Sequence, residues 1–200
     1  MAISLNDIAL RYKSDKASWG HNYTKLYTKY FAELRDKPIQ LMEIGIGDHG
    51  GDTFRIWNEY FPNAKHLIGI DNNRNLLNKA QLLPKVSTHW ADQGNIESLE
   101  ILSKHIKEFC GELDIIIDDG SHENKHIINT FEILFPLLKN GGYYIIEDTY
   151  KSYIDIIPGI TSIQYFSNLI PSLDFKISGL PNKEIATIHF YPEIIIIQKA

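Results

Sequence analysis

The feature that most constrains the fold is a regular alternation of short apolar runs with longer amphipathic stretches. Four amphipathic stretches, at residues 52–61, 73–83, 99–109 and 125–139, separate five apolar runs at 39–46, 64–71, 86–92, 113–119 and 142–148. Several apolar runs are continuous rather than alternating, which is typical of strands covered on both faces in a parallel sheet. Alternation of strands and helices at this spacing predicts a doubly wound α/β fold.

Two further apolar segments end the chain, at residues 186–191 and 193–200. They are separated only by Pro192, which predicts an antiparallel hairpin. The complete prediction is a mostly parallel, seven-stranded Rossmann-like sheet with a C-terminal antiparallel hairpin. The length of 200 residues suits a single domain, residues 1–200. Within it we expect an N-terminal helical cap over the active site at 1–37 and a core at 38–200.

Charge and cysteine content exclude several classes of protein. The formal net charge is -5 and the basic residues are scattered, so no nucleic-acid partner is expected. The single cysteine, Cys110, excludes an intramolecular disulfide and suits a reducing cytosol. Neither a signal-peptide pattern nor an apolar run of membrane-spanning length is visible. We therefore expect a cytoplasmic protein without membrane insertion.

Acidic residues lie at or near the ends of all five parallel strands. In an open α/β sheet, ligands bind outside the carboxyl ends of the strands. A single acid at such a position is commonly a helix cap or a turn residue. Acids at five strand ends instead indicate a ligand-binding rim. They are Glu43, Asp71, Asp92, the pair Asp118 and Asp119, and the pair Glu147 and Asp148.

The loop after the first strand, "EIGIGDHGG", indicates the kind of cofactor. Gly45 and Gly47 allow the backbone to approach a ligand closely, but the G-x-G-x-x-G pattern of dinucleotide sites is absent. Asp48 and Asp52 would repel a pyrophosphate. The loop therefore favours a cationic, phosphate-free nucleoside such as S-adenosylmethionine.

Two of the strand-end positions have specific roles in this hypothesis. Asp71 is placed to accept hydrogen bonds from the ribose hydroxyls, and Asp92 with Gln93 would reach the adenine. A nicotinamide-dependent oxidoreductase is an alternative. Its Tyr-x-x-x-Lys pattern occurs at Tyr12 and Lys16, before the first strand, where it is not expected.

The stretch "DIIIDDGSHENKH" allows a further alternative, because His122 to His126 match the H-E-x-x-H pattern of zinc-dependent hydrolases. In those enzymes both histidines lie on one face of a long helix. Here the pair follows the strand-ending residues Asp119 and Gly120, and Ser121 is expected to cap the next helix. This places His122 at the helix entrance and makes His126 a packed or surface histidine of the helix.

The chain resembles class I S-adenosylmethionine-dependent methyltransferases, and more narrowly the magnesium-dependent macrolide sugar O-methyltransferases of the mycinamicin and macrocin type. The residues that carry the resemblance span nearly the whole chain: "SDKASWGHNYTKLYTKYF", "LMEIGIG", "IGID", "DDGSH", "GGYYIIEDTY" and "IHFYPEIIIIQK".

The resemblance implies roles for individual residues. Asp119, Glu147 and Asp148 would bind Mg²⁺, and His122 would be the catalytic base. It also implies that Ser14 and the segment from Glu43 to His49 line the cofactor. The complete expected cofactor-binding set is Ser14, Glu43, Gly45, Ile46, Gly47, Asp71, Asp92, Gln93 and Asp119.

The predicted function is an O-methyltransferase that uses S-adenosylmethionine and Mg²⁺ to methylate a sugar hydroxyl. The metal would chelate two neighbouring hydroxyls and lower their pKa, while His122 accepts the proton. The sugar would belong to a glycan or to a glycosylated natural product. The sequence leaves open whether the protein forms a homo-oligomer.

Overall fold

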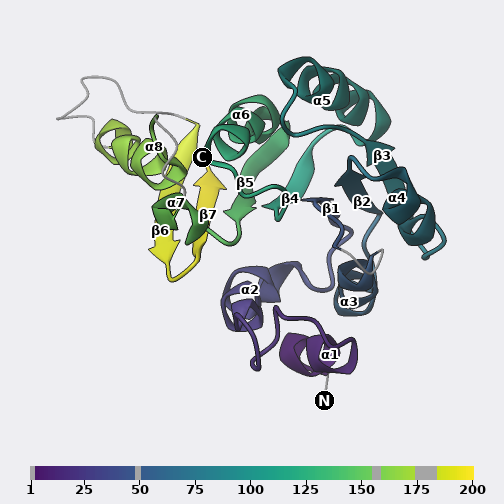
Figure 1. Ribbon diagram of the computed structural model, residues 1–200. Helices are drawn as coiled ribbons and strands as arrows, with labels where there is room; N and C mark the ends of the chain where they lie inside the picture. The colour runs from purple at the N-terminus through teal and green to yellow at the C-terminus, as the bar shows by residue number, and fades with distance from the viewer. Residues whose placement is uncertain (1–2, 48–50, 155–158, 174–183) are drawn as a thin grey trace. The chain divides into compact units, whose positions relative to one another are not determined.

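The computed structural model describes residues 3–47, 51–154, 159–173 and 184–200. The chain divides into two compact units, Met1–Trp90 and Ala91–Ala200. Within the described residues, seven strands form a mixed, mostly parallel sheet with an antiparallel pair at the C-terminus, which confirms the predicted fold class (Figure 1). In the part of the chain that is described, no helix has the length and apolarity that crossing a bilayer requires. The prediction that residues 1–200 form a single domain stays a prediction.

The first unit contains three parallel strands in the order β3-β2-β1. They are β1 (Gln40–Ile44), β2 (His66–Asp71) and β3 (Val86–Trp90). The helices of this unit are α1 (Leu5–Arg11), α2 (Tyr23–Phe31), η1 (Ala32–Leu34), α3 (Asp52–Tyr60) and α4 (Arg74–Ala80).

An aromatic core holds the N-terminal helices of this unit against α3. Tyr27 and Phe31 stack at 5.0 Å between ring centroids, and Tyr27 meets Trp57 edge-on at 5.6 Å. All three rings are almost completely buried, as is Tyr23. Each contributes a large apolar area to the core, together with edge-to-face contacts. Tyr23 and Tyr27 therefore pack in the core, and a cap function for residues 1–37 stays a prediction.

The second unit contains four strands in the order β4-β5-β7-β6. They are β4 (Leu113–Asp118), β5 (Leu138–Ile146), β6 (Ile185–Tyr191) and β7 (Ile194–Lys199). Strands β4 and β5 are parallel, whereas β7 runs antiparallel to both β5 and β6, as the predicted hairpin requires. The helices are α5 (Ile96–Cys110), α6 (Asn124–Leu134), η2 (Phe135–Leu137), α7 (Lys151–Ile154), α8 (Ser162–Asn168) and η3 (Ile170–Leu173).

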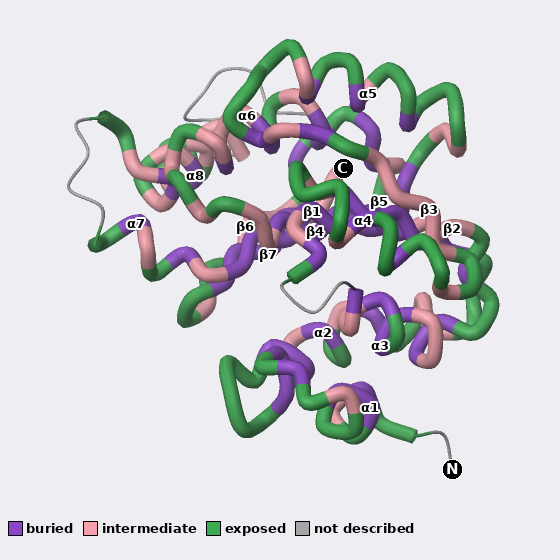
Figure 2. Tube along the Cα trace, turned by 45° about the vertical axis from the view of Figure 1, so that its right-hand side comes forward, coloured by how far each residue is buried: buried purple, intermediate pink, exposed green. Residues whose placement is uncertain are grey.

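The isoleucine runs form the interior of this unit. Every residue of β4 is buried, and so are the four isoleucines that begin β7 (Figure 2). Burial of one such side chain contributes roughly 1.5–3 kcal/mol relative to leaving it in water. Continuous burial along β4 confirms that this strand is covered on both faces.

One boundary differs from the prediction. The helix expected at 125–139 ends at Leu134, and β5 begins at Leu138 rather than at Gly142. Pro136, within η2, has no amide proton for a helical hydrogen bond, so the helix cannot continue through it. The strand then includes Gly141 and Gly142.

Candidate active site

The loops after β4 and β5 leave the sheet at the same edge. Asp118 is in register with Ile146, and the amide of Glu147 donates a hydrogen bond to the carbonyl of Asp118 at 3.0 Å. Asp119 and His122 belong to the first of these loops, and Asp148 belongs to the second. The parallel pairing therefore brings together acids that are distant in sequence.

Among the described residues, one group of three acidic or imidazole side chains could hold a metal ion: Asp119, His122 and Asp148. Its donor atoms lie within 4.8 Å of one another. The Nε2 atom of His122 lies 3.9 Å from Oδ1 of Asp119 and 3.8 Å from Oδ2 of Asp148. The side chains are 13%, 25% and 19% exposed for His122, Asp119 and Asp148, so the group is sheltered but still open to solvent.

The backbone at this group is held in an unusual conformation. His122 has a φ angle of 59° and Asp148 one of 55°, both in the left-handed region. Such a conformation costs a non-glycine residue roughly 1–3 kcal/mol and persists only where the surroundings impose it. Residues of this kind are concentrated at functional sites.

The donor set fits Mg²⁺. This ion prefers oxygen ligands in an octahedron at about 2.1 Å, which places neighbouring donors roughly 3 Å apart and opposite donors roughly 4.2 Å apart. Asp119 and Asp148 supply two carboxylates at compatible spacing, and partial exposure leaves room for water or substrate oxygens. Glu147 is almost completely buried and lies outside the group of three, so its role as a metal ligand stays a prediction.

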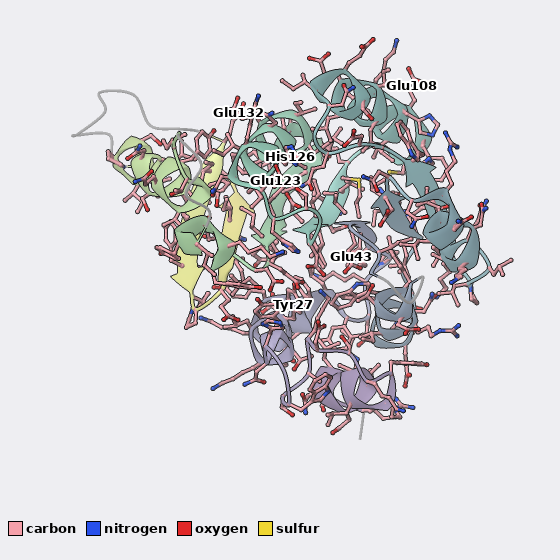
Figure 3. All side chains as sticks on the ribbon, in the orientation of Figure 1. Tyr27, Glu43, Glu108, Glu123, His126 and Glu132 are labelled. Carbon is pink, nitrogen blue, oxygen red and sulfur yellow. The ribbon has the colours of Figure 1, made fainter. Side chains whose placement is uncertain are left out.

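The geometry of a zinc-hydrolase helix is not found in the H-E-x-x-H stretch. Helix α6 begins at Asn124, so His122 precedes the helix. The Nδ1 atom of His126 lies 2.9 Å from the Ser121 hydroxyl. Its Nε2 atom lies 3.5 Å from Oε2 of Glu123, the residue that directly precedes the helix (Figure 3). The expectation that Ser121 caps this helix is wrong, because the N-cap residue is Glu123; the Ser121 hydroxyl instead accepts the Glu123 amide at 3.4 Å.

Gln93, in the second unit, forms hydrogen bonds with the end of β4 and with the loop that carries Asp119 and His122. Its side-chain amide donates to Oδ1 of Asp118 at 2.7 Å, and its carbonyl oxygen accepts the backbone amide of Ser121 at 2.9 Å. Asp118 is fully buried, and this burial raises the pKa of its carboxyl to about 7, although the hydrogen bond from Gln93 opposes the rise. The sequence identified Asp118 only as a strand-end acid and carried no signal for this pairing. Contact of Gln93 with adenine stays a prediction.

The neighbouring Asp92 has a local role in the loop that precedes α5. Its Oδ1 accepts a hydrogen bond from the backbone amide of Gly94 at 2.9 Å, and its own backbone amide donates to the Ser98 hydroxyl at 3.0 Å. This arrangement forms the turn that enters α5. Contact of Asp92 with adenine stays a prediction.

In the first unit, Asp71 connects the end of β2 to the glycine-rich loop. Its Oδ2 accepts the amide of Ile46 at 3.1 Å, and its Oδ1 accepts the amide of Asn73 at 2.7 Å. Gly45 and Gly47 have φ angles of 81° and 69°, which glycine adopts without steric cost. A carboxylate can accept about four hydrogen bonds, so Asp71 keeps capacity for a ribose diol.

Glu43 and Ser14 lie in a buried polar cluster of the first unit. The Glu43 carboxylate is 0% exposed, accepts the indole N–H of Trp57 at 2.8 Å, and lies 3.8 Å from the ammonium of Lys16. The Ser14 hydroxyl accepts the amide of Lys16 at 3.3 Å. The sequence analysis missed Lys16 as a partner of Glu43, because a lysine in a loop carries no signal for burial. Cofactor contacts of Glu43 and Ser14 stay predictions.

Three polar residues of the glycine-rich loop remain, and one of them lies in the described part of the chain. Asp48 and His49 lie outside the described residues. Asp52 begins α3, where a negative charge is favourable, and it forms an ion pair with Arg55 at 3.5 Å.

The parallel strands, the left-handed glycine turn after β1 and the acids at the ends of β2, β4 and β5 together define a class I methyltransferase type of α/β protein. No family model matches the chain. Sequence and structure comparisons nevertheless identify its relatives.

The chain is 34% identical to 8-demethyl-8-alpha-L-rhamnosyl tetracenomycin-C 2'-O-methyltransferase of Streptomyces olivaceus, across 98% of this chain and 54% of the relative. It is 35% identical to L-olivosyl-oleandolide 3-O-methyltransferase of Streptomyces antibioticus, across 86% of this chain and 46% of the relative. The chain thus spans about half the length of these curated relatives.

Among solved structures, the chain is similar to the MycE methyltransferase from the mycinamycin biosynthetic pathway in complex with Mg and SAH. The TM-score is 0.84 and the identity 27%, over 100% of this chain and 55% of that one. A second MycE structure, with Mg, SAH and mycinamycin VI, gives a TM-score of 0.82 at 27% identity, over 99% of this chain and 55% of that one. The chain belongs to the family of sugar O-methyltransferases that these relatives represent, and the predicted resemblance is confirmed.

Proposed function

We propose that the protein transfers a methyl group from S-adenosylmethionine to a sugar hydroxyl, with Mg²⁺ as a second cofactor. The observation that carries the proposal is the arrangement of Asp119 and Asp148 around His122, at 3.9 and 3.8 Å from its Nε2 atom. The relatives support the same chemistry, because they are named as sugar O-methyltransferases and the MycE structures contain Mg and SAH.

His122 is the proposed general base. Its Nε2 atom would accept the proton of the sugar hydroxyl as the oxygen attacks the methyl carbon, a role typically worth about 10²–10⁴-fold in rate. The neighbouring carboxylates of Asp119 and Asp148 would stabilise the imidazolium that forms. Since His122 is held in a left-handed conformation before α6, its ring is kept off the helix and beside these acids.

Asp119 and Asp148 would hold the metal, with Glu147 as the proposed third acid. When bound, Mg²⁺ polarises the oxygens that it contacts and lowers the pKa of a sugar hydroxyl. Sheltering of the two carboxylates would strengthen their attraction for the cation, because water screens charges less there than at an open surface.

The proposed cofactor contacts are those expected from the sequence. The Asp71 carboxylate accepts hydrogen bonds from the amides of Ile46 and Asn73. Its remaining lone pairs would accept hydrogen bonds from the ribose hydroxyls. Gly45 and Gly47 have no side chains, so the ligand could approach the backbone at these two positions. S-Adenosylmethionine supplies an electrophilic methyl group on a positively charged sulfur. The full proposed set is Ser14, Glu43, Gly45, Ile46, Gly47, Asp71, Asp92, Gln93 and Asp119.

The proposed acceptor is a sugar attached to a natural product. The names of the two curated relatives contain rhamnosyl and olivosyl groups, and one MycE structure contains mycinamycin VI. A cytoplasmic location is proposed from the single cysteine. Formation of a homo-oligomer is an open prediction.

The direct test is to incubate the full chain with S-adenosylmethionine, Mg²⁺ and a panel of rhamnosylated or olivosylated aglycones. Mass spectrometry should show addition of one methyl group, which chelation with EDTA abolishes and excess Mg²⁺ restores. Tight binding of NAD in place of S-adenosylmethionine, or unchanged turnover in EDTA, would contradict the proposal.

A further inference from the structure

A small polar cluster joins three segments of the second unit, and we call it the Asn124 cluster (Asn124, Ser152 and Ser162). Oδ1 of Asn124 accepts two hydrogen bonds, from the Ser152 hydroxyl at 2.8 Å and from the Ser162 amide at 2.7 Å. The two serine hydroxyls also contact each other. Ser152 is 4% exposed and Ser162 is 0% exposed, so water does not compete freely for these bonds.

The Asn124 cluster lies directly next to the candidate active site along both loops. Asn124 is the first residue of α6 and follows His122 by two positions. Ser152 lies in α7, in a tight turn in which the amide of Lys151 donates to the carbonyl of Asp148 at 3.2 Å. The hydrogen bond between Ser152 and Asn124 therefore ties the Asp148 loop to the His122 loop, beyond the point where strand pairing ends.

The Asp148 loop has a second hydrogen-bonded contact, to the C-terminal hairpin. The Asp148 loop is also held by the Thr149 amide, which donates to the carbonyl of Glu193 in the β6–β7 turn at 3.0 Å. That bond fixes the loop to the hairpin and not to the loop that carries His122. The left-handed φ angles of His122 and Asp148 need restraint on both loops, since an unrestrained loop would relax to an ordinary conformation.

We propose that Asn124 and Ser152 are positioning residues that set the separation of Asp148 from His122 and Asp119. The inference rests on the proposed function, because it assigns these residues to the metal-binding step of that reaction. Hydrogen-bonded partners behind metal ligands typically change metal affinity by about 10–100-fold when they are removed. A purely structural role, holding α8 beside α6, would change stability without changing metal affinity (Figure 1).

The test compares Ser152→Ala and Asn124→Ala with the wild type by titration of the full chain with Mg²⁺ in a calorimeter. Both variants should bind Mg²⁺ about 10–100-fold more weakly. In turnover assays the Mg²⁺ concentration for half-maximal rate should rise, while kcat at saturating Mg²⁺ stays near the wild-type value. The matched control is Ser103→Ala, which loses a part-buried hydrogen bond from its hydroxyl to the Ile133 carbonyl of the same helix α6. It should leave Mg²⁺ affinity unchanged.

A second measurement, made without metal, separates failure of this inference from failure of the proposed function. Amide hydrogen exchange should quicken at Thr149, Lys151, Ser152 and Ser162 in Asn124→Ala, but not in Ser103→Ala. A crystal structure of Ser152→Ala should show Asp148 displaced from His122.

The outcomes are distinct. Wild-type protein that does not bind Mg²⁺ would overturn the proposed function alone, and the exchange and crystal data would then decide the positioning role. The inference would be overturned if both cluster variants bound Mg²⁺ as tightly as the wild type. It would also be overturned if the Ser152→Ala structure kept the 3.8 Å distance between Nε2 of His122 and Oδ2 of Asp148.

Discussion

The Nε2 atom of His122 lies 3.8 Å from Oδ2 of Asp148, although the two residues come from loops that follow different strands. Each residue has a left-handed backbone, and each loop begins at the end of a strand in the parallel pair β4 and β5. This relationship assigns His122 to a group with two carboxylates rather than to a pair with His126.

His122→Ala should lower kcat by about 10²–10⁴-fold, because the hydroxyl loses its proton acceptor. Affinity for S-adenosylmethionine and Mg²⁺ should change little. Steady-state kinetics and calorimetry on the same preparations measure both quantities. His126→Ala is the control and should keep its metal and most of its activity. Equal loss of metal from both variants would favour the zinc-hydrolase alternative.

Asp148→Asn and Asp148→Ala should both weaken Mg²⁺ binding, since each removes a carboxylate charge from the group. Asparagine tolerates the left-handed conformation better than alanine does. Asp148→Ala should therefore unfold at lower denaturant concentration than Asp148→Asn, by an amount on the order of 1 kcal/mol. Calorimetry with Mg²⁺ and urea unfolding check the two effects. Strong metal binding by Asp148→Asn would remove this residue from the ligand set.

Asp71→Ala should weaken S-adenosylmethionine binding by about 1.5–3 kcal/mol, the usual worth of a hydrogen bond to a charged acceptor. The variant also loses the bonds that hold the amides of Ile46 and Asn73. The exposed Asp36→Ala is the control for loss of one negative charge in the same unit. Isothermal calorimetry gives both affinities. Unchanged binding in Asp71→Ala would exclude the residue from the cofactor site.

Lys16→Met should destabilise the protein by about 3–5 kcal/mol, because it removes a cation from beside the buried Glu43 carboxylate. The double variant Lys16→Met with Glu43→Gln should recover much of this loss, since neither charge is then buried. Urea unfolding of the wild type, both single variants and the double variant completes the thermodynamic cycle. Strict additivity of the two single effects would show that the pair is not coupled.

The raised pKa of Tyr165 predicts that the stability of the protein falls at alkaline pH. Burial and the hydrogen bond that its hydroxyl donates to Glu132 raise the pKa of Tyr165 well above that of a free tyrosine. Above pH ~10 the unfolded chain therefore loses this proton first, and the free energy of unfolding falls as pH rises. Tyr165→Phe should show a shallower fall in urea midpoint over this range. Tyr153→Phe, at an exposed tyrosine, should match the wild type; equal slopes in all three proteins would contradict the assignment.

Local patterns in the sequence determined the order and type of the elements. The continuous isoleucine runs predicted buried strands, and the segments around Pro192 predicted the hairpin, because burial on both faces and turn formation depend on nearby residues. Pro136 could have been used in the same way to end α6 before β5. The motif "DDGSH" likewise pointed to Asp119 and His122 through resemblance to a family.

Tertiary structure alone decided which side chains meet. Three pairings join residues from separate segments of the chain: Gln93 with Asp118, Lys16 with Glu43, and Asn124 with Ser152. No periodicity records such contacts, because they depend on strand register and on how each loop bends after leaving the sheet. The same holds for the left-handed backbone at His122 and Asp148, because aspartate and histidine visit that region more often than most residues but are found elsewhere far more commonly. The sequence thus named the acids and the histidine, and the parallel register of β4 and β5 brought them within reach of a single ion.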